Sequence, residues 1–167
     1  GLGDVYKRQD LILGKQCQTK MGRGGIRPLE FKTFSKEMQN AITNYCQAGG
    51  NFFVSGAYVA SDLWDNRLVK ANEEDKKFAM EVLKYKWRVG QAARNGKVKS
   101  VASPFPEITG SYTYYQDLNP ESYVVESPDA LEPAAQGAFT ILRYSENNLS
   151  AGIAYKGNYK TLSLIHI

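Results

Sequence analysis

Histidine is nearly absent from this chain of 167 residues, which holds only His166, the second-last residue. Cysteine is scarce as well, since Cys17 and Cys46 are the only two and form no CxxC motif. Hydrolysis by a serine or cysteine triad needs a base beside the nucleophile, and that base is usually histidine. Zinc sites of the common His/Cys type need more ligands than two distant cysteines supply. The composition therefore argues against both chemistries, and we expect no metal and no cofactor.

Long apolar runs are missing too, so the sequence predicts no membrane span. The net charge of +4 and the pI near 9.0 make the chain only mildly basic, which by itself does not indicate a nucleic-acid partner. The glycine-rich segment 15–27 matches neither common phosphate-binding fingerprint, and we interpret it as a surface loop. The two cysteines leave one disulfide and two free thiols equally open.

The two ends of the chain are translations of one DNA string in its two orientations. Residues 4–9 read DVYKRQ, which GATGTGTATAAGAGACAG encodes, and residues 162–167 read LSLIHI, which its reverse complement encodes. That string resembles the transposon end used to tag sequencing libraries. We therefore expect residues 1–9 and 162–167 to be adapter-derived and residues 10–161 to be a single domain fragment. The absence of a signal peptide then carries no meaning.

The stretch 34–63 predicts a helix, a glycine stop and a buried strand. Ser35 suits the N-cap of this helix. One apolar stripe at helical spacing runs through Met38, Ala41, Ile42 and Tyr45. Gly49 and Gly50 suit the helix end, and the short apolar run 52–54 is typical of a strand covered on both faces. Residues 55–62 would then lie at the carboxyl end of that strand, where open α/β sheets bind ligands.

Further elements follow from local signals. Residues 72–75 open a second helix, whose apolar stripe continues to residue 85. Asn95-Gly96 predicts a tight turn that joins strands 87–93 and 97–102 into a hairpin. Short strands are expected at 111–115 and 123–125, and a strand pair at 138–144 and 150–156. The domain is therefore expected to combine helices with strands and to end in β-hairpins.

Three places offer side chains for ligand contact. Asp62 and Trp64 follow the buried strand and suit a sugar shelf, although the start of a helix is the simpler interpretation. Glu126 and Asp129 suit an acid/base pair, although an ordinary Asp/Pro turn is favoured. Ser55 lies where an esterase nucleophile would lie but lacks the flanking glycines of GxSxG. The ligand-binding candidates are Ser55, Tyr58, Asp62, Trp64, Glu126 and Asp129, and no catalytic residue is assigned.

Three stretches carry a resemblance to a known group: YCQAGGNFFVSGAYVASDL (45–63), SYVVESPDALEP (122–133) and GAFTILRYSENNLSAGIAYKGNYKT (137–161). They resemble the C-terminal part of exported Bacteroidetes proteins that carry the name xanthan lyase and often a golvesin-type domain. The order of helix, Tyr-x-x-x-Gly-Gly and strand is shared with class I glutamine amidotransferase-like domains. The resemblance implies an α/β domain with a three-layer, flavodoxin-like fold, truncated at both ends and followed by C-terminal β-hairpins.

Two functions follow as expectations. The amidotransferase cysteine and histidine have no counterpart here, so the first is a non-catalytic domain within an exported, carbohydrate- or envelope-associated protein. The second is a carbohydrate-active enzyme, a lyase or hydrolase, that works with carboxylates and tyrosines. In both, the expected partners are a carbohydrate ligand and other domains of the same longer chain. The enzyme would need Asp62 within reach of Glu126 or Asp129 across one concave pocket.

Overall fold

The computed structural model describes residues 21–22, 25–26, 32–65, 71–116, 125 and 127–165. Its helices are α1 (Lys36–Gln47), α2 (Ser61–Trp64), α3 (Glu73–Phe78) and the π-helix η1 (Ala79–Leu83). The strands are β1 (Met21–Gly22), β2 (Gly25–Ile26), β3 (Phe52–Ser55), β4 (Tyr85–Val89), β5 (Lys97–Ser100), β6 (Ser111–Thr113), β7 (Ala130–Pro133), β8 (Ala138–Tyr144), β9 (Ser150–Lys156) and β10 (Lys160–Leu164).

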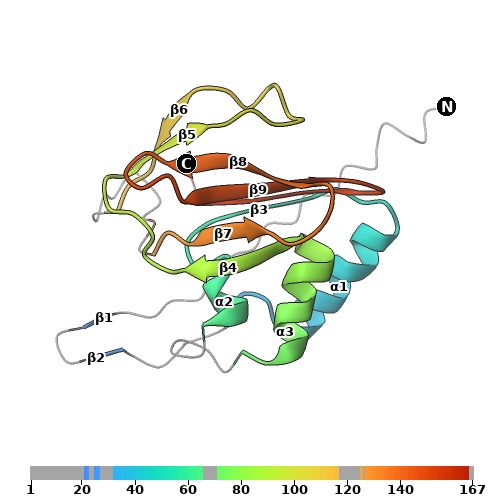
Figure 1. Ribbon diagram of the computed structural model, residues 1–167. Helices are drawn as coiled ribbons and strands as arrows, with labels where there is room; N and C mark the ends of the chain where they lie inside the picture. Colours follow the sequence, from blue (N-terminus) through green and yellow to red (C-terminus); the bar gives the residue numbers. More distant parts are fainter. Residues whose placement is uncertain are drawn as a thin grey trace.

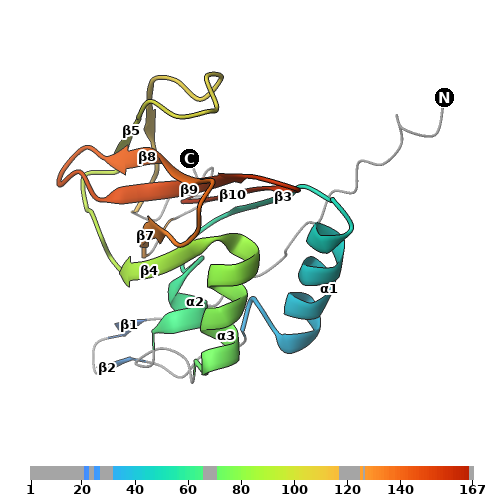
Figure 2. The ribbon, with the colours of Figure 1, turned by 45° about the vertical axis from the view of Figure 1, so that its right-hand side comes forward.

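A curled six-stranded sheet dominates the structure, with the strand order β3-β10-β9-β8-β5-β6. Only β3 and β10 pair in parallel, and the other neighbours in this sheet are antiparallel. β4 and β7 form a separate antiparallel pair. Figures 1 and 2 show this pair and the helices below the large sheet, while β5 and β6 rise on its other side.

The predicted three-layer, flavodoxin-like α/β fold is therefore wrong. Such a fold needs a mostly parallel sheet with helices on both faces. Here the described strands are mainly antiparallel and joined by hairpins, and the described helices gather on one side of the sheet. Helix and strand alternate only in the first part of the chain, and the hairpins after residue 85 decide the architecture.

Helix α1 confirms the local prediction. Ser35 is its N-cap, and the Ser35 hydroxyl accepts a hydrogen bond from the Met38 amide at 3.3 Å. Of the predicted apolar stripe, Ile42 is buried, Met38 and Tyr45 are half-buried and Ala41 is exposed. Gly49 takes the left-handed conformation with φ of +87° just after the helix. The second predicted helix is also present as α3, and it continues into η1.

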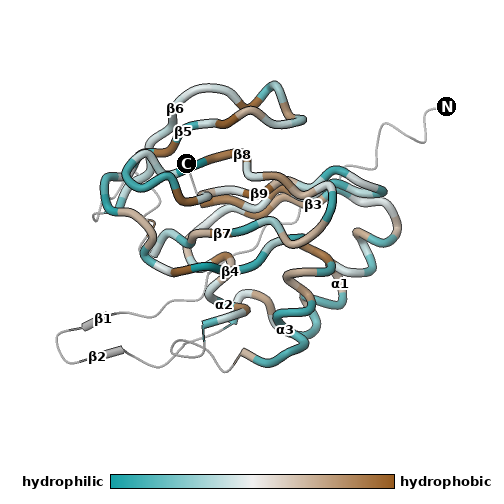
Figure 3. Tube along the Cα trace, viewed as in Figure 1, coloured by the Kyte–Doolittle hydropathy of each residue, from teal (hydrophilic) through white to brown (hydrophobic). Residues whose placement is uncertain are grey.

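Two apolar clusters fill the two sides of the sheet. The helix-side cluster joins α1 and η1 to β3 and β9, and its members include Ile42, Phe52, Val54, Leu83 and Ile153. The curl-side cluster lies between β5, β8, β9 and the end of β10, and it includes Val98, Ile141, Tyr144, Ala154 and Leu164. Figure 3 shows hydrophobic residues along the central strands and hydrophilic residues along much of the outer helices.

One of the two predicted hairpins is present, and the other is not. Residues 138–144 and 150–156 form β8 and β9, which pair as expected. The expected hairpin of 87–93 with 97–102 is wrong, because β4 pairs with β7 and β5 pairs with β6 and β8. Gly96 nevertheless takes a turn conformation, with φ of +65°. The chain turns there as predicted but enters a different sheet.

The last strand includes part of the expected adapter-derived end. Leu162, Ser163 and Leu164 belong to β10, where they pair with β3 on one side and β9 on the other. Their origin stays a prediction, and residues 1–9 lie outside the described part. Among the described residues, no helix combines the length and apolar character that crossing a membrane needs.

Candidate functional site

The chain leaves β3 through a tightly held loop. The Gly56 amide donates to the Leu164 carbonyl at 3.2 Å, and the Tyr58 amide donates to the Ser127 carbonyl at 3.3 Å. Tyr58 is buried and has φ of +58°, a backbone conformation that few tyrosines adopt. The loop leads directly into α2, a helix of one turn. The predicted site region is therefore folded inward and anchored to two distant segments.

Asp129 caps the start of α2 from far along the chain. Ala60, at the N-cap position of α2, makes no side-chain capping bond. Instead, one Asp129 oxygen, Oδ2, accepts from the amides of Ala60 and Ser61, both at 2.8 Å, and from the Ser61 hydroxyl at 3.1 Å. The other oxygen accepts from Trp87 Nε1 at 3.3 Å. Asp129 thus supplies the cap that the local sequence lacks.

The Asp129 carboxyl is fully buried, and this burial raises its pKa to about 6 although its four donors act in the opposite direction. Two buried tyrosines surround it. The Tyr144 hydroxyl donates to the Asp129 backbone carbonyl at 2.6 Å, and the Tyr85 hydroxyl donates to the Val59 carbonyl at 2.5 Å. Burial raises the pKa of Tyr85 well above its usual value, and the negative charges of Asp129 and Asp62 raise it further. Both tyrosines are neutral hydrogen-bond donors that fix backbone carbonyls.

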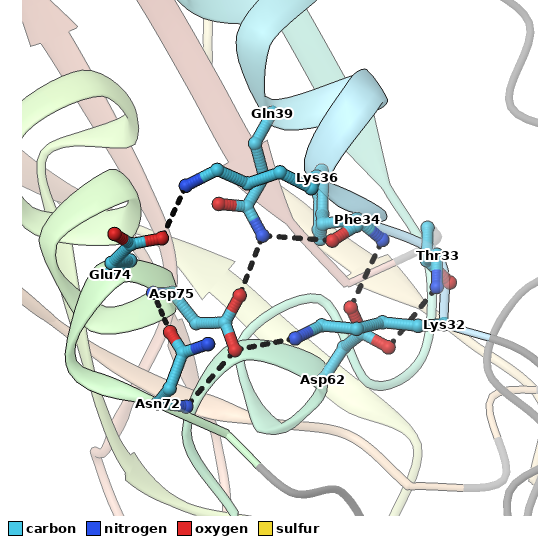
Figure 4. A network of polar contacts seen from close by, with 9 residues as sticks. All are labelled: Lys32, Thr33, Phe34, Lys36, Gln39, Asp62, Asn72, Glu74 and Asp75. Carbon is cyan, nitrogen blue, oxygen red and sulfur yellow. Dashed lines mark hydrogen bonds and ion pairs between the residues drawn. The ribbon is translucent and has the colours of Figure 1, made fainter.

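Asp62 holds a different segment. It lies in the first turn of α2 and is fully buried. Its carboxylate oxygens accept from the Thr33 amide at 3.2 Å and the Phe34 amide at 3.1 Å, as Figure 4 shows. Asp62 therefore ties α2 to the segment that enters α1.

Asp75 is the centre of the adjoining network in Figure 4. Its carboxylate accepts from Lys32 Nζ, from Gln39 Nε2 and from the Asn72 amide. Burial disfavours its charged form, but these donors outweigh burial and hold the pKa of Asp75 below its usual value. The sequence indicated only that residues 72–75 open a helix, and the buried network around Asp75 was missed. The N-x-x-D spacing of a capping box was the available signal for the role of Asp75.

A shallow groove of about 290 Å³ lies between α1 and the pair α3 and η1. Lys36, Gln39, Glu74, Lys77 and Glu81 are among its lining residues, so charges of both signs surround it. Gln39 and Lys36 are occupied by Asp75 and Glu74 in the network of Figure 4. No sequence motif pointed to this groove.

The predicted site residues have different surroundings. Tyr58, Asp62 and Asp129 are buried, and Ser55 and Trp64 are half-buried at the ends of β3 and α2. Glu126 lies outside the described residues. Ser61 links α2 to Asp129, but the carboxylates of Asp62 and Asp129 bond to different segments. Both act there as structural acceptors.

The remaining groups to consider in the described residues are metal-ligating side chains and the Cys46 thiol. No group of three or more His, Cys, Asp or Glu side chains in that part is arranged to hold a metal ion. Cys46 is buried, and burial raises the pKa of its thiol to about 11, which disfavours the reactive thiolate. Cys17 lies outside the described residues.

No protein-family model matches this chain, and no curated protein is significantly similar to it.

Proposed function

We propose that this chain forms a non-catalytic domain of an exported protein that associates with carbohydrate or with the cell envelope. Its partners would be a carbohydrate ligand and other domains of the same longer chain, with no nucleic acid. The assignment to an exported, carbohydrate-associated protein rests on the sequence resemblance of residues 45–63, 122–133 and 137–161. The non-catalytic assignment rests on the chemistry of the candidate site.

The bonding of Asp62 and Asp129 is the observation that carries the proposal. An acid/base pair for sugar chemistry needs two carboxyl groups that face a substrate and exchange protons with it. Both of these carboxyl groups are fully buried and accept backbone amides as their partners. Proton exchange with a substrate would break the bonds that hold the start of α1 and the start of α2.

A depolymerisation assay tests the proposal. The whole chain is incubated with xanthan and with a neutral glucan, and two products are followed: the ultraviolet absorbance of unsaturated uronates for a lyase, and new reducing ends for a hydrolase. We expect neither product, together with measurable retention of the protein on at least one immobilised polysaccharide.

Asp62→Asn distinguishes the two functions. In a non-catalytic domain this substitution lowers the melting temperature and has no turnover to remove. In a carbohydrate-active enzyme it abolishes turnover by a protein that stays folded. Turnover by the wild type that disappears in this variant would refute the non-catalytic assignment.

A further inference from the structure

An apolar row with two exposed ends crosses the face of the large sheet that is turned away from the helices. The register pairs Phe53 of β3 with Leu162 of β10, Leu162 with Ala154 of β9, and Ala154 with Phe139 of β8. Paired residues of neighbouring strands project from the same face of a sheet. Their neighbours Phe52, Val54 and Ile153 project to the opposite face, where they belong to the helix-side cluster.

The two ends of this row are open to solvent. Phe53 is 58% exposed and Phe139 is 36% exposed, although most large apolar side chains among the described residues are buried. Ala154, between them, is fully buried and forms the floor. Figure 1 shows β5 and β6 rising on the side of the large sheet that is turned away from the helices, at the sheet end opposite to β3. The row therefore presents two exposed aromatic rings on one face, with covered apolar residues between them.

Two cations lie beside the row on the same face. Lys160 pairs with Lys156 across β10 and β9, two residues from Leu162 and Ala154 respectively. Because side chains alternate along a strand, both lysines project on the side of the apolar row. Both are exposed, and no ion pair is found for either among the described residues. We call Phe53, Phe139, Lys156 and Lys160 the platform; all four lie within residues 10–161.

We propose that the platform binds an anionic polysaccharide, with the two phenylalanine rings stacked on sugar rings and the two lysines paired with carboxylates. The C–H bonds of a sugar face carry partial positive charge and fit the negative face of an aromatic ring. The lysines supply the complementary charge for uronate or pyruvate groups. This proposal rests on the carbohydrate association proposed above and names the surface and the ligand class.

The size of the platform favours a sugar chain over a protein. From the usual area of an aromatic side chain, the two exposed phenylalanines offer on the order of 200 Å² of apolar surface. A stable protein partner covers about 800 Å² on each side. Single-stranded nucleic acid prefers a basic groove that follows its backbone, whereas this face is an open sheet with two lysines.

Binding measurements on the whole chain test the platform. Xanthan is the anionic probe, hydroxyethyl cellulose the neutral one and oligothymidylate the nucleic-acid control, and each is titrated by calorimetry at low and high salt. We expect xanthan to bind, and Phe53→Ala and Phe139→Ala each to weaken its binding about tenfold. Lys156→Gln combined with Lys160→Gln weakens it about fivefold at low salt and little at high salt.

Matched controls lie elsewhere on the surface. Tyr115→Ala removes an aromatic side chain that is 52% exposed, and Lys86→Gln removes an exposed cation of β4. Both should bind xanthan as the wild type does. All substitutions are at exposed positions, and circular dichroism of each variant verifies the fold. If a phenylalanine-to-alanine variant unfolds, the leucine variant of the same residue (Phe53→Leu or Phe139→Leu) replaces it, because leucine keeps an apolar side chain but removes the ring.

The possible failures are distinguishable. Wild-type binding to polysaccharide that none of the platform variants weakens would overturn the platform and leave the proposed function standing. No binding of the wild type to either polysaccharide would overturn both. Oligothymidylate binding that is as tight as xanthan binding and equally sensitive to Phe53→Ala would assign the platform to nucleic acid. A dimer in sedimentation that Phe53→Ala dissociates would assign it to a second copy of the chain.

Discussion

Removal of the Asp129 carboxyl should be among the most damaging single changes in this chain. Asp129→Ala deprives three donors at the start of α2, and also Trp87 Nε1, of their acceptor. A buried donor without a partner costs about 1–3 kcal/mol, and partial relaxation reduces the sum. We expect a loss of about 3–5 kcal/mol, the usual range for breaking a buried, hydrogen-bonded charged or polar pair. For a chain of this size that corresponds to a melting temperature lower by about 6–20 °C.

The pH dependence of that loss follows from the raised pKa. In the folded state the pKa of Asp129 rises from 3.8 to about 6, so folding favours the protonated acid. The resulting stability is complete below pH 3.8 and is lost as the pH rises through 6. Two pKa units correspond to about 3 kcal/mol. Asp129→Ala should therefore cost more near pH 5 than near pH 8, where the wild type itself bears the cost of a buried charge.

The assay is urea unfolding followed by circular dichroism at both pH values, with Glu132→Ala as the matched control. Glu132 lies three residues after Asp129, in β7, but is exposed, and its ion pair with Arg88 contributes at most about 1 kcal/mol. If Asp129→Ala destabilises the protein no more than Glu132→Ala does, the capping role is wrong. If its cost increases from pH 5 to pH 8, the burial argument for the raised pKa is wrong.

Three further predictions concern local features, each measured as the free energy of urea unfolding. Asn72→Ala breaks the capping box of α3 and should cost about 1 kcal/mol, whereas no loss would contradict the cap. Ser163→Ala should stabilise the protein by about 1 kcal/mol, because the buried Ser163 hydroxyl lacks a partner among the described residues. Thr161→Val should destabilise it by a similar amount, because the Thr161 hydroxyl donates to the Leu83 carbonyl. The same sign for both would contradict this reasoning. Gly96→Ala should cost at least about 2 kcal/mol, since the added Cβ would lie 2.5 Å from the Tyr114 carbonyl oxygen at a positive φ; a neutral effect would rule out this turn geometry.

Local signals predicted the local structure well. Ser35 and Gly49 mark the two ends of a helix through interactions between near neighbours, and the structure confirms both. The predicted apolar stripe is confirmed only in part, because Ile42 is buried whereas Ala41 is exposed. The β8 and β9 pair also follows from alternation around a short turn. These features depend on contacts within a few residues, which is the range that a sequence pattern encodes directly.

Strand pairing over long separations could not be predicted in the same way. The only parallel pair of the large sheet joins β3 to β10, and β4 skips the nearby β5 to pair with β7. Neither pairing leaves a local pattern, because a strand has the same alternation whichever neighbour it has. The apolar run at residues 52–54 predicted a strand covered on both faces, but β3 lies at the edge of the sheet and Phe53 is exposed. That error led from a correct helix and strand to an incorrect fold class.

For the candidate carboxylates, too, the sequence identified the residues but not their role. Asp62 and Asp129 were selected because they follow strands, and the structure describes both as acceptors for backbone amides of segments that are 28 to 69 residues away. A helix of one turn such as α2 does not form alone, because few intrahelical bonds offset the cost of ordering it. It needs partners from outside, and the two aspartates supply them. The carboxylates of Asp62 and Asp129 are therefore committed to holding the fold. A ligand is better sought where aromatic rings and cations are exposed to solvent. On the described part of the large sheet, the platform combines both.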